Sequence, residues 1–207
     1  MYSGDAVTTL DELAAGVEAA ALDVVCVTDH HAVAGALAAL ERDLACRIIV
    51  GEEIRTGAGE VIGLFLGERV PYGIAISDAV AQIRDQGGLV YAPHPFDPTR
   101  HALRESVLRD LCAGGGVDAI EVFNAKTSLA HLNERAAALA VEFELPGGAG
   151  SDAHDPAAIG AAYVEMPDFD GPAGFLASLR QATVVGHHFD RPRDFVPRII
   201  PGGLRQT

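Results

Sequence analysis

Short apolar runs alternate along the chain with longer stretches whose apolar residues recur at helical spacing. Val24–Thr28 and Leu89–Ala92 are continuous apolar runs of strand length, and Ser128–Phe143 has the spacing of a long helix. Continuously apolar strands separated by helices are typical of a parallel sheet that is covered on both faces. The pattern therefore predicts an α/β fold, either a barrel or an open doubly wound sheet.

The same pattern predicts the remaining helices and strands, and it divides the chain into one domain and a tail. Thr9 and Glu12 have the spacing of a capping box and predict a helix that runs to about Ala21. Further helices are expected at Ala34–Ala45, Ser77–Gln86, Leu103–Leu111 and Pro172–Gln181, and further strands at Arg47–Val50, Val61–Leu66, Ala119–Phe123, Pro146–Gly150, Tyr163–Met166 and Thr183–Val185. From Phe189 onward, Pro and Arg occur with little periodicity, so residues 1–188 are expected to form one domain and 189–207 an extended tail.

Composition narrows the class of protein. The 207 residues are 49% hydrophobic, enough for a sizeable core, and the formal net charge is −14. That charge disfavours binding of long nucleic acid, while the absence of an apolar run of about 18 residues argues against a membrane span. Cys26, Cys46 and Cys112 are far apart and form no CxxC pair, which predicts reduced, mostly buried thiols in a cytoplasmic protein.

Metal-binding residue types follow several of the predicted strands. They are Asp29, His30 and His31 after the first strand, Glu52 and Glu53 after the second, His94 in "PHPF", and Asp152 and His154 in "SDAH". Because the carboxyl ends of parallel strands lie side by side, these side chains are expected to meet. Each alone could be a satisfied loop histidine or a solvated carboxylate, but that alternative has to hold at several strand ends at once. In an extended segment His31 would point away from His30, so it is expected to be structural.

The chemistry of this set favours catalytic metal ions. Imidazole and carboxylate without thiolate suit Zn, Mn and Fe and do not resemble a structural zinc site. Several ligands of each kind indicate more than one ion, with Glu53 as the natural bridging carboxylate. Two such ions can activate a water and stabilise the leaving oxygen of a phosphoester.

Five segments together resemble a known family. "VTDHHAVAGALAALE", "GEEI", "GGLVYAPHPFDP", "IEVFNAKT" and "AGSDAH" are similar to the successive motifs of the PHP (polymerase and histidinol phosphatase) superfamily, in order from about Tyr2 to Val185. The resemblance implies a distorted (β/α)7 barrel of the TIM-like type. It also implies a metal-dependent phosphoesterase with two or three divalent ions, commonly Mn, Fe or Zn.

The resemblance assigns roles one residue at a time. The positions that match metal ligands are His30, Glu53, His94, Asp152 and His154, together with Asp5 of "YSGD", which is a ligand in some members only. Asp29 would orient His30, and Asn124 and Glu121 would line the site. Arg100 is a candidate phosphate clamp, with Arg55 and Lys126 as further candidates, although each could equally be a solvated surface charge.

The sequence departs from the family at its beginning. Members start with a strand that carries an H-x-H pair just before "YSGD", whereas here "YSGD" stands at residues 2–5 and that first strand is missing. Truncation at Met1 is the favoured hypothesis, and a degenerate, non-catalytic binding or accessory module is the alternative. A related hydrolase of C–N or C–O bonds with a carbamylated lysine is disfavoured because Lys126 is the only lysine. The expected substrate is a small phosphomonoester or a nucleotide, with no membrane partner.

Overall fold

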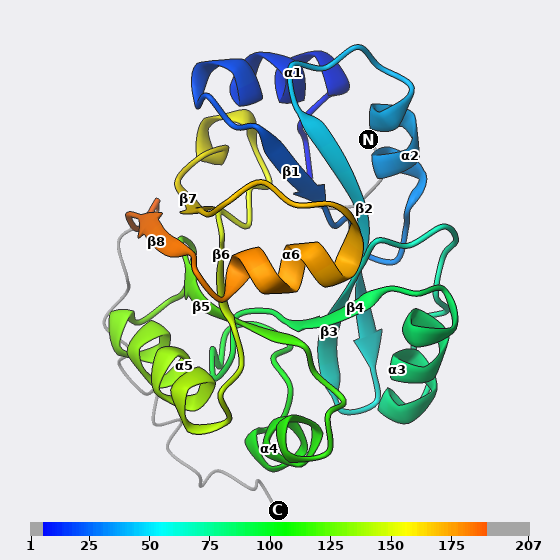
Figure 1. The fold of residues 1–207 in the computed structure, drawn as a ribbon, viewed down its shortest axis with the longest axis vertical. Coiled ribbons are helices and arrows are strands. Elements are labelled where there is room, and N and C mark those ends of the chain that lie inside the picture. The colour runs from blue at the N-terminus through cyan, green and yellow to red at the C-terminus, as the bar shows by residue number, and fades with distance from the viewer. Residues whose placement is uncertain (1–5, 190–207) are drawn as a thin grey trace, which may run out of the picture.

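A curled six-stranded sheet forms the centre of the molecule (Figure 1), in the order β1-β2-β3-β4-β5-β6. The computed structural model describes residues 6–189, so Asp5 and nearly all of the expected tail lie outside the described residues. The strands are β1 (Val24–Val27), β2 (Arg47–Thr56), β3 (Gly59–Leu64), β4 (Leu89–Ala92), β5 (Ala119–Asn124) and β6 (Gly147–Gly150). β1 and β6 are the two edges of this half-barrel.

One strand of the sheet runs against the others. β1 and β2 are parallel, and so are β4, β5 and β6, whereas β3 is antiparallel to both β2 and β4. The expectation of a purely parallel sheet is therefore wrong at β3. The reason is the connection: only Gly57 and Ala58 join β2 to β3, which is long enough for a hairpin and too short for the crossover that a parallel pair needs.

β2 is longer than its apolar run. The sequence predicts a strand that stops at Val50, but β2 continues to Thr56 because its second half pairs with β3. Glu53 consequently lies inside a strand, opposite Ile62, and not beyond a strand end. It still lies level with the end of β1, since His30 forms an isolated parallel bridge with Glu53.

Helices cover the sheet as expected, with differences at their ends. They are α1 (Leu10–Ala19), α2 (Ala34–Leu40), α3 (Ile76–Asp85), α4 (Glu105–Ala113), α5 (Ala130–Glu142) and α6 (Gly171–Leu179), with a short 3-10 helix at Pro156–Ala158. The Thr9 capping box is confirmed. Ser77 does not cap α3, because that helix begins earlier, after Ala75. β7 (Ala162–Glu165) and β8 (Thr183–Gly186) form a separate antiparallel pair.

The apolar core lies on both sides of the sheet. The larger cluster includes Ile54, Ile83 and Leu108 and joins the outer face of the sheet to α3, α4 and α5. On the concave face, Phe175 of α6 belongs to a cluster with Leu89 and Ala119, the first residues of β4 and β5. In Figure 1, α6 crosses in front of the sheet. α6 therefore packs near the amino ends of these strands, and the carboxyl ends are left for a site.

In the part of the chain that the structure describes, no helix has the length and apolarity that crossing a bilayer requires.

Candidate metal centre

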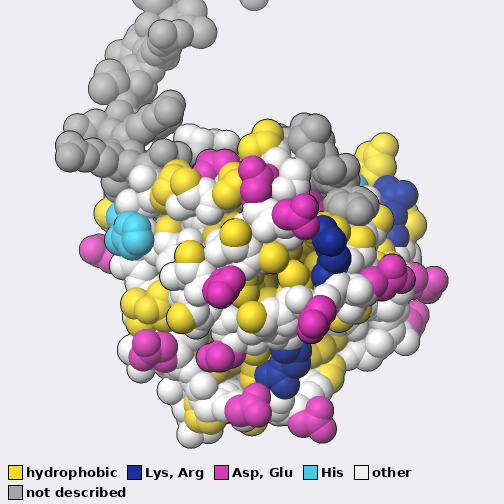
Figure 2. Space-filling view, turned by 90° about the horizontal axis from the view of Figure 1, so that it is seen from above, with side chains coloured by type: hydrophobic (Ala, Val, Ile, Leu, Met, Phe, Trp, Pro, Cys, Tyr) yellow, Lys and Arg dark blue, Asp and Glu magenta, His cyan; other side chains and the backbone are white. Residues whose placement is uncertain are grey.

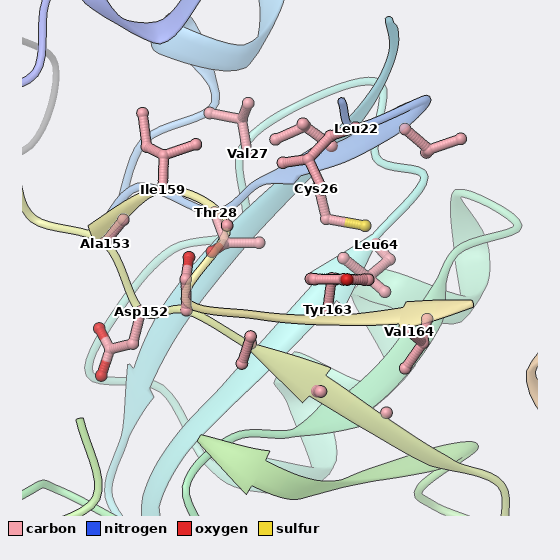
Figure 3. A pocket seen from close by; sticks show the side chains of 18 of the residues that line it. Leu22, Cys26, Val27, Thr28, Leu64, Asp152, Ala153, Ile159, Tyr163 and Val164 are labelled. Carbon is pink, nitrogen blue, oxygen red and sulfur yellow. The ribbon is translucent and has the colours of Figure 1, made fainter. Parts of the chain in front are cut away.

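A cavity of about 1130 Å³ lies on the concave side of the sheet. Figure 3 shows Asp152 toward one end and Cys26, Tyr163 and Val164 toward the other. The lining at the Asp152 end also includes His30, Glu53, His94, Glu121, Asn124 and His154. The cavity therefore gathers metal-binding residue types at the carboxyl ends of the strands, and the rest of its lining is mixed apolar and polar.

Cys26 differs from its expected place in the core. Its side chain faces the cavity and is reached by solvent, although protein surrounds it closely enough for burial to raise the pKa of the thiol to about 12. Cys112 is buried, as expected, and Cys46 is partly buried. Cys26 is thus accessible in space but held in its neutral thiol form.

Glu53 lies between two histidines from different strands. His94, which follows β4, places Nε2 2.8 Å from Glu53 Oε1. His30, which follows β1, places Nδ1 3.7 Å from Glu53 Oε2. The peptide N–H groups of Glu53 and His31 donate to the carbonyls of Asp29 and Glu53, which fixes the two segments side by side. Each carboxylate oxygen of Glu53 thus faces a different imidazole.

Glu60 joins this group and was not among the residues singled out in the sequence. Ligand atoms of His30, Glu53 and Glu60 all lie within 4.8 Å of one another. Glu60 is 5% exposed, and burial followed by the nearby Glu53 charge raises the pKa of its carboxyl group. It was missed because it is the second residue of β3 and does not lie beyond the end of a predicted strand. The signal that could have found it is a glutamate at the tip of a hairpin whose other strand carries Glu53.

A second group of polar side chains centres on Asp152. Its Oδ2 lies 3.1 Å from Arg100 Nη2 and accepts from Asn124 Nδ2 at 3.3 Å, while its Oδ1 lies 3.2 Å from His154 Nδ1. Burial opposes ionisation of Asp152, but these partners outweigh burial and lower its pKa to about 2. The ring centroids of His30 and His154 are 6.3 Å apart, so the Asp152 group adjoins the Glu53 group.

Glu121 links the Glu53 group to the Asp152 group through hydrogen bonds. Its Oε2 accepts from the His94 peptide N–H at 2.6 Å and from Asn124 Nδ2 at 3.0 Å. Burial raises the pKa of Glu121 to about 7. Asn124 therefore lines the site as expected, and it holds the carboxylates of Glu121 and Asp152 in place.

The charge distribution fits a cation in this place. Burial disfavours protonation of His94, but its hydrogen bond to Glu53 and the charges of Glu53, Glu121 and Asp152 outweigh burial and raise its pKa to about 9. His94 Nδ1 is buried and has no hydrogen-bond partner among the described residues. The donor set contains imidazole and carboxylate and no thiolate, as Zn, Mn and Fe sites of catalytic type do. A divalent cation would neutralise the same carboxylates that here hold a proton on His94.

Asp97 shapes the loop that carries His94 and Arg100. Its carboxylate accepts hydrogen bonds from the peptide N–H and hydroxyl groups of both Thr99 and Ser128, at 2.7–2.9 Å. Its own peptide N–H donates to the His94 carbonyl, and its carbonyl accepts from the Arg100 N–H. Asp97 therefore ties the loop after β4 to the loop after β5.

Most of the described candidates from the sequence come to one end of the sheet. Glu52 does not join them, because it alternates with Glu53 along β2 and its Oε2 accepts from the Val70 N–H instead. His30, Glu53, His94, Asp152, His154, Arg100 and Asn124 belong to the two adjoining groups, and Asp29 lines the same cavity. Asp5 lies outside the described residues. His31 donates its peptide N–H to Glu53, while its ring stacks on Tyr72.

Sequence and fold comparisons point to one family. Residues 130–184 match the family model described as PHP-associated. The fold is similar to a two-domain protein from Bacteroides vulgatus that contains a predicted PHP-like metal-dependent phosphoesterase. The TM-score is 0.67 at 18% identity, over 88% of this chain and 61% of that one. The comparisons thus show a PHP-associated match over residues 130–184 and a fold like that of PHP-like proteins.

Two curated relatives of this chain come from Methanocaldococcus jannaschii. Uncharacterized protein MJ1587 is 40% identical over 106 residues, which is 50% of this chain and 59% of the relative. Uncharacterized protein MJ0417 is 37% identical over 144 residues, which is 65% of this chain and 61% of the relative. The matches thus span about three fifths of the length of each relative.

Proposed function

We propose that this chain is a PHP-type metal-dependent phosphoesterase that hydrolyses a small phosphomonoester or a nucleotide. The observation that carries the proposal is the meeting of His30, Glu53, Glu60 and His94, from three different segments, beside the Asp152 group. Such a mixed imidazole and carboxylate set at the carboxyl ends of barrel strands is typical of a catalytic metal centre. The proposal includes two or three ions of Mn, Fe or Zn and a (β/α)7 barrel for the complete domain.

The residues divide into two ligand groups. His30, Glu53, Glu60 and His94 would hold one cation, and Asp152 with His154 would hold another next to it. When bound, such cations supply a water of lowered pKa and neutralise charge on the phosphate. Glu53 suits a shared ligand because each of its oxygens faces a different histidine.

Arg100 and Asn124 have positioning roles in this proposal. Arg100 is partly buried, with 24% of its side chain exposed, and its Nη2 lies 3.1 Å from Asp152 Oδ2. The rest of its guanidinium can donate to phosphate oxygens, for which its planar fork is well suited. Asn124 bridges Asp152 and Glu121 and holds both carboxylates in place by donating to each. The Glu53 N–H donates a hydrogen bond to the Asp29 carbonyl. This bond fixes the position of the neighbouring His30 relative to β2.

The negative charge of the protein favours a small substrate over a long polyanion. The formal net charge is −14, and on the face shown in Figure 2 acidic side chains are spread widely while Lys and Arg are few. A long polyanion would meet repulsion over such a surface. A small phosphoester needs favourable charge only at the site itself.

The test is metal content and hydrolysis measured on the same preparations. We expect the wild-type chain, loaded with Mn²⁺, to retain metal after gel filtration and to hydrolyse p-nitrophenyl phosphate. Glu53→Gln keeps the size of the side chain but removes its charge, so bound metal should fall by about one equivalent and kcat/KM about 100-fold or more. Glu41→Gln, at the exposed acidic position directly after α2, is the matched control and should change neither.

Unchanged metal content and turnover in Glu53→Gln would overturn the assignment of the centre. Tight metal binding by the wild type without turnover of any phosphoester would overturn the catalytic proposal and favour a binding module.

A further inference from the structure

A group of aromatic and cationic side chains borders the candidate metal centre. His31 follows His30 directly, and their ring centroids are 5.8 Å apart. The His31 ring stacks on Tyr72, with centroids 4.7 Å apart and planes 28° apart, and Arg69 Cζ lies 5.6 Å from the Tyr72 ring. This group, which we call the rim and to which Arg55 also belongs, has no role in the function proposed above.

The backbone holds the rim in place. The segment that carries Tyr72 runs along β2, with the Gly73 N–H donating to the Arg55 carbonyl at 2.7 Å and the Gly57 N–H donating to the Ile74 carbonyl at 3.2 Å. Tyr72 is nevertheless 59% exposed, an unusual place for a fixed aromatic ring. Its position is therefore set by the fold, while one part of its ring stays open to solvent.

His31 adopts a backbone conformation that is unfavourable for its residue type. Its φ is +56°, in the left-handed region that non-glycine residues rarely adopt. Its Nδ1 is buried and has no hydrogen-bond partner among the described residues. Burial lowers the pKa of its imidazole first, and the charges of His30, Arg55 and Arg69 lower it further.

The two rim arginines are loosely paired. Arg55 Nε is 3.8 Å from Glu60 Oε1, and Arg69 Nε is 3.8 Å from Glu52 Oε1, both beyond hydrogen-bond distance. The other arginine–carboxylate pairs of residues 6–189 approach to 3.4 Å or less. In that same range, neither Arg55 nor Arg69 donates a hydrogen bond, and their side chains are 43% and 49% exposed. Both guanidinium groups thus keep their donors available.

We propose that the rim binds a second anionic group of the substrate, a carboxylate or a further phosphate, with Arg55 and Arg69 as its donors. Tyr72 would lie against the carbon skeleton that joins this group to the phosphate being hydrolysed. Guanidinium groups recognise carboxylate and phosphate in the same way, so both chemistries fit. In a chain of net charge −14, two available arginines beside a metal centre favour an anion at that point. The inference rests on the proposed phosphoesterase function, whose substrate class it narrows to phosphoesters with two anionic groups.

The test uses three substrates with the same three-carbon skeleton. Propyl phosphate has one anionic group, 3-phosphooxypropanoate adds a carboxylate, and 1,3-propanediol bisphosphate adds a phosphate. We expect kcat/KM of the Mn²⁺-loaded protein to be at least about tenfold higher for one of the two substrates with a second anionic group, equivalent to about 1.4 kcal/mol. Whichever of these two substrates has the higher kcat/KM shows whether the rim prefers a carboxylate or a phosphate.

Substitutions in the rim test whether its side chains cause this substrate preference. Arg69→Gln and Tyr72→Ala should reduce it to about twofold or less, mainly through KM, and leave propyl phosphate hydrolysis unchanged. Arg42→Gln, at an exposed arginine that pairs with Asp11 of α1, is the control and should keep the preference. Equal kcat/KM for all three substrates in the wild type would overturn the inference and leave the proposed function intact. A preference that survives in both rim variants would also overturn it.

A binding measurement separates this inference from the proposed function. Inorganic tripolyphosphate is titrated calorimetrically into the wild type and Arg69→Gln. If no substrate is hydrolysed, at least about fivefold weaker binding to the variant would still support an anion site at the rim. Equal affinities would then overturn both proposals.

Discussion

Replacement of Asp97 by alanine should destabilise the protein by about 3 kcal/mol at pH 7. The Asp97 carboxylate is 1% exposed and accepts hydrogen bonds from Thr99 and Ser128, one from the N–H and one from the hydroxyl of each. Hydrogen bonds to an ionised group contribute about 1.5–3 kcal/mol each. Thr99 is exposed and can turn its donors to water, so the net loss is well below the sum of these bonds.

The loss should depend on pH in a defined direction. Burial alone would raise the pKa of Asp97, but the hydrogen bonds from Ser128 and Thr99 outweigh burial and hold it below its ordinary value of 3.8. A carboxyl group whose pKa is lower in the folded state stabilises that state fully above its unfolded pKa. This stabilisation disappears as the pH falls through the folded pKa. The difference between wild type and Asp97→Ala should therefore stay constant from about pH 5 to 8 and shrink below about pH 4.

The assay is urea unfolding followed by far-UV circular dichroism at several pH values, with m values compared between variants. Ser128→Ala removes one hydroxyl donor and should cost about 1 kcal/mol, while Asp43→Ala, at an exposed position, should cost less than about 0.5 kcal/mol. A loss below about 1 kcal/mol for Asp97→Ala at pH 7 would refute the reasoning. A difference that persists unchanged at pH 3 would refute it as well.

Two further predictions concern the hairpin tip and the cavity. Gly59 has φ +134°, and an added Cβ would lie 2.6 Å from the Ala102 carbonyl oxygen and from Leu103 Cα. Gly59→Ala should therefore cost about 2 kcal/mol or more and lower Tm by about 5 °C in a thermal scan; an unchanged Tm would contradict the packing of this hairpin. Cys26 should react with Ellman's reagent at pH 8 at least about 100-fold more slowly than free cysteine, because burial raises its thiol pKa to about 12. This rate is measured in a variant that keeps Cys26 as its only cysteine, and reaction as fast as free cysteine would show that the thiol is not shielded.

Local sequence patterns were sufficient for most of the elements. The apolar runs at β1, β4 and β5 and the helical spacing of α5 follow from residue types within a few positions, and the structure places these elements close to their expected ranges. The same local reading placed His30, His94 and Asp152 just after strands. Since strands of one direction end at one side of a sheet, their meeting at a common edge could be predicted without knowing the order of the strands.

Pairing between distant segments decided the rest. β2 continues past its apolar run and β3 reverses direction because the two strands pair with each other, and the sequence of either one alone does not carry that information. Glu60 joins Glu53 through this hairpin, and Tyr72 reaches His31 because its segment runs along β2. The sequence by itself determined which residues can bind a metal or an anion. Only the tertiary structure determined which of them meet, because the distances between their side chains are set by strand pairing and not by separation along the chain.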